Sequence, residues 1–267
     1  KKYIGQDLIF TDGTTLLGGD DKAGIAAIVT MAEYFCKHPE VPHGPIQICF
    51  GPDEEVGRGT ENLSIERFGA DLAYTVDGDG LGGIFDETFN AAEAQISIKG
   101  ISVHPGTAKG IMKNALEIGT ELIDMLPALE RPQFTDGREG YYHPFVFNGT
   151  VENGFIRCII RDHDMVRYKE RMAYIEKCVD AINERYGNCT AELKFVNIYY
   201  NMGEVVRKVP FMLDYCKQAM RDCGVEPFTV ALRGGTDGAW ISQMGLPCPN
   251  ITAGYENAHG HYEFVCI

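Results

Sequence analysis

The stretch AGIAAIVTMAEYFCK, residues 23–37, indicates the fold class of this 267-residue chain. Its apolar residues recur with the spacing of a helix that buries a face. Two short and largely apolar runs follow, IQICF at residues 46–50 and LAYTV at residues 72–76, and turn residues flank both of them. Runs of this kind are typical of buried strands. The alternation of helix and strand predicts an α/β fold with a doubly wound sheet.

The pattern changes near residue 90. Residues 94–99 alternate like a strand with one buried face, and three further segments follow it: a helical one at 111–126, a long charged amphipathic helix at 162–186 and a strand pattern at 191–196. These segments predict an α+β unit in which two helices cover an antiparallel sheet.

The sequence pattern typical of an α/β fold returns after this unit. Pro210 stands at a helix start, a helical pattern follows at 211–223, and a glycine-rich turn lies at 233–238. We therefore expect the second domain to be inserted into the first. The predicted catalytic domain comprises residues 1–89 and 204–267, and the predicted inserted domain comprises residues 90–203.

The charge balance excludes two classes of partner. The chain has 24 Lys and Arg against 38 Asp and Glu, a net charge of -14, and such a surface repels both nucleic acid and anionic membranes. The sequence also lacks an apolar stretch of the roughly 20 residues that a membrane-spanning helix needs. Its nine cysteines are odd in number, scattered and never spaced as C-x-x-C, which indicates reduced thiols and a cytoplasmic location.

Three adjacent acids stand out in GPDEEVGRG, residues 51–59: Asp53, Glu54 and Glu55. They follow a predicted strand, and ligands usually bind where the strands of an open α/β sheet end. Adjacent carboxylates raise each other's pKa, so they are tolerated when one is protonated, when one faces outward, or when a cation is bound. A solvated acidic turn is the alternative interpretation.

Acids recur at two further strand ends. GGDDKAG, residues 18–24, places paired aspartates before the first helix, where an aspartate could also simply cap the helix. Asp77 opens DGDG, but an EF-hand register from this residue would place Leu81 and Thr88 at ligand positions, which excludes that calcium loop. Together with the histidines of HGHYE, residues 259–263, these acids predict a site for divalent metal ions with Asp, Glu and His ligands.

Eight strings extend these motifs along essentially the whole chain: LLGGDDKAG (16–24), PDEEVGRG (52–59), YTVDGDG (74–80), VHPGTAKG (103–110), YYNM (199–202), RGGTDGA (233–239), GLPCPN (245–250) and HGHYEF (259–264). In this order they resemble the tripeptide aminopeptidases of the dizinc exopeptidase family, which also includes aminoacylase and carboxypeptidase G. The resemblance implies a zinc exopeptidase-type catalytic domain with an inserted α+β lid and dimerisation domain.

The resemblance also implies a role for each acid. Asp20 would bridge two zinc ions, Glu55 and His259 would bind the first zinc, and Asp77 would bind the second. Glu54 would be the general base that takes a proton from the activated water and passes it to the leaving amine.

Three further residues follow from the resemblance. His104 would come from the inserted domain of a partner subunit in a homodimer and would steady the oxyanion, although a simple turn histidine before Pro105 is the alternative. Arg233 would bind the terminal carboxylate of a small peptide substrate, a task that suits a guanidinium. Arg161 is a second candidate for that task, and an exposed arginine at a strand end explains it equally well.

The chain departs from the family in one motif. The family carries an early His-x-Asp whose histidine binds the second zinc, and none of the seven histidines here has an aspartate two positions later. We therefore expect the chain to be a fragment. The site of Asp20, Glu55 and His259 would be complete, and the site of Asp20 and Asp77 would lack its histidine.

The predicted function is therefore a zinc-dependent aminopeptidase that releases the N-terminal residue of tripeptides. VHPGTAKG together with RGGTDGA favours this substrate class. Two alternatives stay open: another exopeptidase or amidohydrolase of the same clan, or a truncated fragment that binds metal or dimerises without catalysis.

Overall fold

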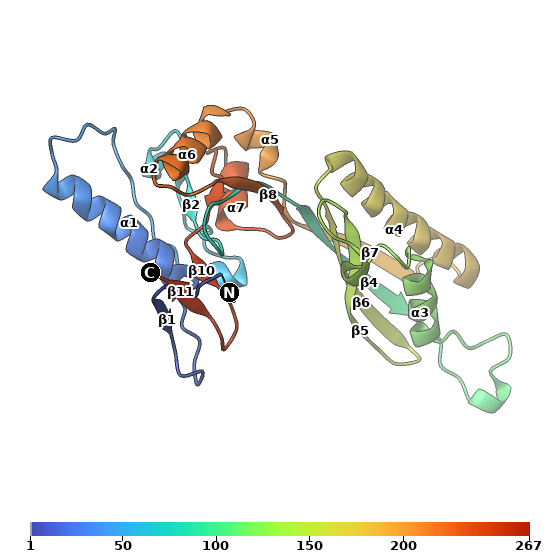
Figure 1. The fold of residues 1–267 in the computed structure, drawn as a ribbon. Coiled ribbons are helices and arrows are strands. Elements are labelled where there is room, and N and C mark those ends of the chain that lie inside the picture. Colours follow the sequence, from blue (N-terminus) through green and yellow to red (C-terminus); the bar gives the residue numbers. More distant parts are fainter. Residues whose placement is uncertain (1) are drawn as a thin grey trace. The chain divides into compact units, whose positions relative to one another are not determined.

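The computed structural model describes residues 2–267, and these residues form two compact units (Figure 1). The first unit consists of two separate segments, the residues up to Thr88 and Met202–Ile267. The second unit, Phe89–Asn201, lies between these segments in the sequence. No helix within residues 2–267 has both the length and the apolar character needed to cross a bilayer.

A mixed four-stranded sheet forms the centre of the first unit. Its strand order is β2 (Thr75–Val76), β9 (Asn250–Ile251), β3 (Gly83–Thr88) and β8 (Phe228–Leu232). The pairs β2–β9 and β3–β8 are parallel, whereas β3–β9 is antiparallel. The sheet therefore brings the strand before Asp77 beside a strand that lies more than 170 residues later in the chain.

A smaller antiparallel sheet supports the start of the first helix. It has the order β1 (Leu8–Phe10), β11 (Phe264–Cys266) and β10 (Tyr255–Glu256). Helix α1 (Gly19–Lys37) contacts β10, β11 and β2 (Figure 1). The beginning of α1 thus lies close to the chain that leads into β11.

Four further helices belong to the first unit: α2 (Ile65–Phe68), α5 (Gly203–Val206), α6 (Phe211–Asp222) and α7 (Asp237–Gln243). Helix α7 begins after Thr236, whose hydroxyl accepts the N–H of Ala239. Serine and threonine are favoured there because the first N–H groups of a helix have no intrahelical acceptor.

The prediction of a strand at residues 46–50 is wrong. These residues belong to none of the three sheets in the described chain, and Ile46, Ile48 and Phe50 are exposed. A strand needs a neighbour to pair its N–H and C=O groups, and the sequence pattern alone does not supply one. At residues 72–76, only Thr75 and Val76 form a strand.

The middle unit has the predicted α+β architecture. Its antiparallel sheet has the order β5 (Tyr141–Gly149), β6 (Asn153–Asp162), β4 (Asn90–Lys99) and β7 (Ala191–Tyr199), and its helices are α3 (Ala115–Met125) and α4 (Met165–Tyr186). Both helices begin later than the sequence pattern indicates, because Asn114 and Asp164 cap them. The carboxylate of Asp164 accepts the N–H groups of Val166 and Arg167 at 2.8 and 2.9 Å.

The core of the middle unit lies between the sheet and these two helices. Alternate residues of β4 and β6 are buried there, which is the period of two expected of a strand with one covered face. The core residues include Ala92, Ala94, Ile96, Ile98, Ile118, Leu122, Ile156, Cys158, Ile160, Tyr168, Ile175 and Ile182. This unit therefore has a hydrophobic core of its own.

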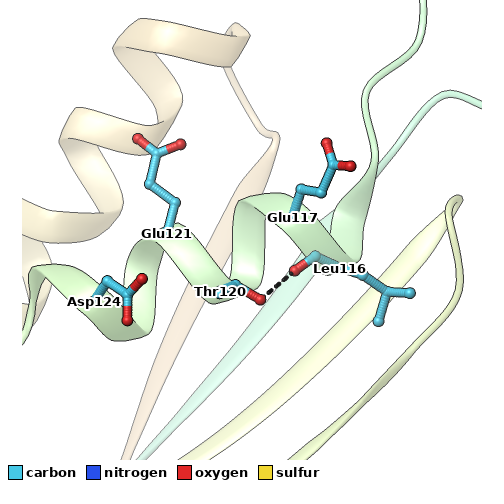
Figure 2. Close-up of a pocket in the computed structure, with 5 residues that line it drawn as sticks. All are labelled: Leu116, Glu117, Thr120, Glu121 and Asp124. Atoms are coloured by element: carbon cyan, nitrogen blue, oxygen red, sulfur yellow. Dashed lines mark hydrogen bonds between the residues drawn. The ribbon is translucent and has the colours of Figure 1, made fainter.

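The outer face of α3 is acidic and solvated. Figure 2 shows the residues that line a shallow depression on it, Leu116, Glu117, Thr120, Glu121 and Asp124. The carboxylate of Glu121 accepts hydrogen bonds from Arg185 and from the hydroxyl of Tyr186. Part of the net negative charge is thus an ordinary helix surface opposite a buried face.

Replacement of Ile160 by alanine should lower the free energy of unfolding of the middle unit by about 2–5 kcal/mol, since it leaves a cavity in a closely packed core. Ile160 is 0% exposed. Urea unfolding followed by circular dichroism measures the change. Val166→Ala is the control, because Val166 is 65% exposed and its loss should cost under about 0.5 kcal/mol. Equal effects of the two changes would contradict this view of the core.

Candidate metal centre

Three residues that lie far apart in the sequence meet in the first unit. Nε2 of His259 lies 3.1 Å from Oδ2 of Asp20 and 2.9 Å from Oε2 of Glu55. The possible ligand atoms of the three residues all lie within 4.8 Å of one another, and among residues 2–267 this is the one such group of three or more. The side chains of His259 and Glu55 are 68% and 56% exposed, so a ligand can reach the group from solvent.

Asp20 lies at an irregular start of α1. The helix follows Gly18, which has a left-handed conformation with φ of 68°, and Asp20 and Asp21 have non-helical dihedral angles. The peptide bond between these two aspartates is cis. The alternative that an aspartate caps this helix is supported for Asp21, because the regular helical conformation begins only after this residue. Its carboxylate accepts the N–H of Gly24 at 3.2 Å, three residues later, as the side chain of a capping residue does.

Glu54 and Glu55 lie in a single turn of 3-10 helix, Glu54–Val56. Asp53 precedes it with a positive φ of 66°, and the N–H of Gly57 closes it on the carbonyl of Glu54 at 2.7 Å. A 3-10 helix has three residues per turn, so neighbouring side chains point in directions about 120° apart. Glu55 reaches His259, while Glu54 is half-buried and lies near other acids.

The carboxylate of Asp77 is held at the end of β2. The hydroxyl of Tyr255 donates to its Oδ1 at 2.9 Å, and the side-chain amide of Asn250 donates to its backbone carbonyl at 3.1 Å. Burial raises the pKa of Asp77 to about 6; the hydrogen bond from Tyr255 opposes this shift, and the charge of Asp20 adds to it.

Neighbouring carboxyl groups show the same effect. Burial raises the pKa of Glu54 to about 7, with further contributions from the charges of Asp77 and Asp237. Burial, followed by the charge of Asp77, also raises the pKa of Asp21 to about 7 and raises the pKa of Asp237. Ionised together, these groups repel one another, so the cluster favours either protons or a bound cation.

The donor set fits a divalent metal ion. Two carboxylates and one imidazole are a ligand combination that zinc accepts, and zinc commonly has three protein ligands where a further position serves substrate or water. The exposure of Glu55 and His259 leaves room for such a position. Asp77, with its carboxyl close to that of Asp20, could contribute to a second ion.

The other predicted site residues have different positions. Arg233 belongs to the first unit and follows β8 directly. His104 and Arg161 belong to the middle unit. His104 is exposed, and its Nδ1 accepts the N–H of Gly106 at 3.1 Å. Arg161 is the penultimate residue of β6, opposite Ala91 and Tyr141, and its Nε is buried, so the alternative interpretation is right about the strand end but not about the exposure.

Sequence reasoning did not identify three residues of this region, namely Tyr255, Asp237 and Glu263. Glu263 ends the HGHYE motif, and its carboxylate accepts the N–H groups of Gly18 and Asp20. Its place in the motif was a signal that could have marked it. The partners of all three residues lie elsewhere in the sequence, so no spacing rule could show these contacts.

Comparison with known proteins defines the class of fold first. Residues 86–187 match the peptidase dimerisation domain of the M20 peptidases. Two solved structures have a TM-score of 0.85 and cover 97% of this chain and 69% of theirs: aminopeptidase PepT from Bacillus cereus, 26% identical, and a tripeptidase from Staphylococcus aureus, 25% identical. The Bacillus subtilis protein YxeP, described as a dinuclear metal binding peptidase of the M20 family, shares the fold at a TM-score of 0.57 and 16% identity over 80% of this chain and 58% of its own. The chain has the mixed α/β fold of the M20 peptidases.

Two relatives are much more similar to the chain in sequence. Over all 267 residues the chain is 53% identical to peptidase T of Caldanaerobacter subterraneus and 49% identical to peptidase T of Fusobacterium nucleatum. The chain is thus a relative of peptidase T, which confirms the resemblance that the eight strings indicate. It covers 65% of the length of each of these two proteins.

Zinc should stabilise the chain through His259. At a free zinc concentration of about 100 times Kd, the free energy of unfolding should rise by about 2.7 kcal/mol, because the ion binds the folded state. Thermal unfolding with zinc and with a chelator measures this difference. His259→Ala should abolish it, whereas His261→Ala should retain it, because His261 is exposed and outside the ligand group. An equal loss in both variants would contradict the assignment of His259.

Proposed function

We propose that the protein is a metal-dependent aminopeptidase that releases the N-terminal residue of tripeptides. The observation that carries this proposal is the convergence of Asp20, Glu55 and His259, with Glu54 directly beside the group. The relationship to peptidase T supports the substrate class. Because the chain spans about 65% of the length of these relatives, the activity of the whole protein belongs to the proposal.

Zinc is the proposed metal, with two ions per active site in the complete enzyme. Asp20, Glu55 and His259 would hold the first ion, and Asp20 and Asp77 would contribute to the second. When bound, zinc polarises a carbonyl oxygen and lowers the pKa of water. The mixed carboxylate and imidazole donor set supports zinc over calcium or magnesium, which prefer oxygen ligands.

Glu54 is the proposed general base. Its side chain is not one of the three grouped ligands, and it is half-buried near the charges of Asp77 and Asp237. A carboxylate in this position can take a proton from the attacking water and return it to the leaving amine. The neighbouring glutamates thereby have separate tasks, since one holds the metal and the other moves a proton.

The remaining proposed roles concern the substrate and the partner. Arg233 would bind the terminal carboxylate of the peptide through its guanidinium, and Arg161 is the second candidate for this contact. His104 would come from the partner subunit of a homodimer and steady the oxyanion. The match of residues 86–187 to a peptidase dimerisation domain supports a homodimer through the middle unit. The nine free cysteines support a reducing compartment, the cytoplasm.

A second candidate function is metal binding without catalysis. It is favoured by the absence of a His-x-Asp motif from the sequence and by the ligand group found among residues 2–267, which contains one histidine and leaves Asp77 outside. A different exopeptidase or amidohydrolase activity of the same clan is the remaining alternative.

Glu54→Gln should lower kcat for tripeptide hydrolysis by about 100-fold or more, because an amide cannot accept the proton. Its zinc content should equal that of the native protein, whereas Glu55→Gln should lose both zinc and activity. Steady-state kinetics and metal analysis of the purified variants measure the two effects. Glu61→Gln is the surface control, since Glu61 is exposed and pairs with Arg58. Unchanged hydrolysis in Glu54→Gln would refute the general base.

Peptide length should separate the proposed activity from others of the clan. We expect cleavage of a tripeptide such as Ala-Ala-Ala and far slower cleavage of Ala-Ala and of N-acetyl-alanine. Release of free alanine, followed by chromatography, is the measurement. Equal rates on the three compounds would contradict tripeptide specificity, and zinc binding without turnover would favour the second candidate.

A further inference from the structure

Glu263 is a buried carboxylate that joins the two segments that carry Asp20 and His259. It is 2% exposed, and its partners are backbone groups from the opposite end of the chain. Its Oε2 accepts the N–H of Gly18 at 2.7 Å, and its Oε1 accepts the N–H of Asp20 at 2.8 Å. One side chain therefore fixes the backbone at the residue that bears a proposed metal ligand.

The same residue closes the turn that carries His259. The N–H of Glu263 donates to the carbonyl of Gly260 at 3.2 Å, and the N–H of Gly260 donates to the carbonyl of Asn257 at 3.1 Å. The side-chain amide of Asn257 donates to the carbonyl of Tyr262 at 3.1 Å. Glu263 thus ends a compact turn around His259 and at the same time holds the segment of Asp20.

The two glycines before Asp20 make this contact possible. Gly18 has a positive φ of 68°, and the N–H groups of Gly18 and Asp20 point at one carboxylate, as in the backbone nests that bind anions. A Cβ on Gly19 would lie 2.8 Å from Cγ2 of Val265 and 3.2 Å from Oε1 of Glu263. The close approach of β11 to the start of α1 therefore requires a glycine at position 19.

The charged surroundings of Glu263 do not favour a carboxylate at this position. No basic side chain in the described chain forms an ion pair with Glu263, and other acids surround the start of α1. A buried carboxylate in such a place costs stability, although an apolar side chain would leave the N–H groups of Gly18 and Asp20 without this acceptor. What a carboxylate adds is two acceptor oxygens that fix two N–H groups at once.

We propose that Glu263 is a positioning residue that sets the spacing between Asp20 and His259 for metal binding, an inference that rests on the proposed metal-dependent function. Residues that hydrogen-bond around metal ligands commonly change metal affinity 10- to 100-fold when they are replaced. Glutamine at this position offers one acceptor oxygen, and its NH2 group would face an N–H donor. One of the two contacts is lost, and the backbone of Gly18 or Asp20 is released.

The test is a titration of the metal-free 267-residue protein with Co²⁺, followed by visible absorption. Glu263→Gln should bind Co²⁺ at least 10-fold more weakly than the native protein, with an altered absorption spectrum. Glu256→Gln is the matched control, because Glu256 lies in the same small sheet and bonds to Lys2 and Tyr3. It should bind Co²⁺ as the native protein does.

The results distinguish a role of Glu263 in positioning the metal ligands from a role in stability alone. Native affinity in Glu263→Gln, or an equal loss in both variants, overturns the proposal, even where the melting temperature falls. If Glu263→Gln fails to fold, Glu263→Asp and Glu256→Asp take its place, and the first should weaken Co²⁺ binding at least 10-fold relative to the second. Native protein that binds Co²⁺ without cleaving tripeptides refutes the peptidase activity but leaves the affinity comparison intact. Native protein that binds no Co²⁺ overturns both.

Discussion

Repulsion among half-buried carboxylates is the constraint on which the arrangement of the first unit depends. Asp21, Glu54 and Asp77 all have pKa values raised toward neutrality by burial and by the charges of nearby acids. A fold that collects acids in this way loses stability unless something positive lies among them. A bound cation would relieve this repulsion, which supports the proposed metal site.

One local turn and two side-chain contacts position the acidic residues of this cluster. The 3-10 turn separates the side chains of Glu54 and Glu55, and Tyr255 holds the carboxylate of Asp77 at the end of β2. Glu263 holds the start of α1. The 3-10 turn is local, whereas the contacts of Tyr255 and Glu263 join segments more than 170 residues apart, so the ligand group depends on both the small sheet and the mixed sheet.

The middle unit is stabilised by apolar packing. Its stability comes from alternating apolar residues of β4 and β6 packed under α3 and α4, and it contains no group of metal-ligating residues among those described. Residues 86–187, most of this unit, match a peptidase dimerisation domain. His104 and Arg161, the two site residues proposed in this unit, thus depend on a core that shares no residue with the metal centre.

The sequence by itself determined the fold class, the α+β character of the middle unit and the residue types of the proposed metal site. Periodicity and the strings of acids and histidines are local properties, so they can be recognised without a structure. The prediction of a strand at residues 46–50 was wrong, because an apolar run becomes a strand only where another strand pairs with it. The family resemblance led to the expectation that Asp20, Glu55 and His259 share one site, and the tertiary structure gave the distances between them. Only the tertiary structure decided that Tyr255 and Glu263 contact this region. Those facts depend on contacts between residues up to about 245 positions apart, which no local pattern encodes.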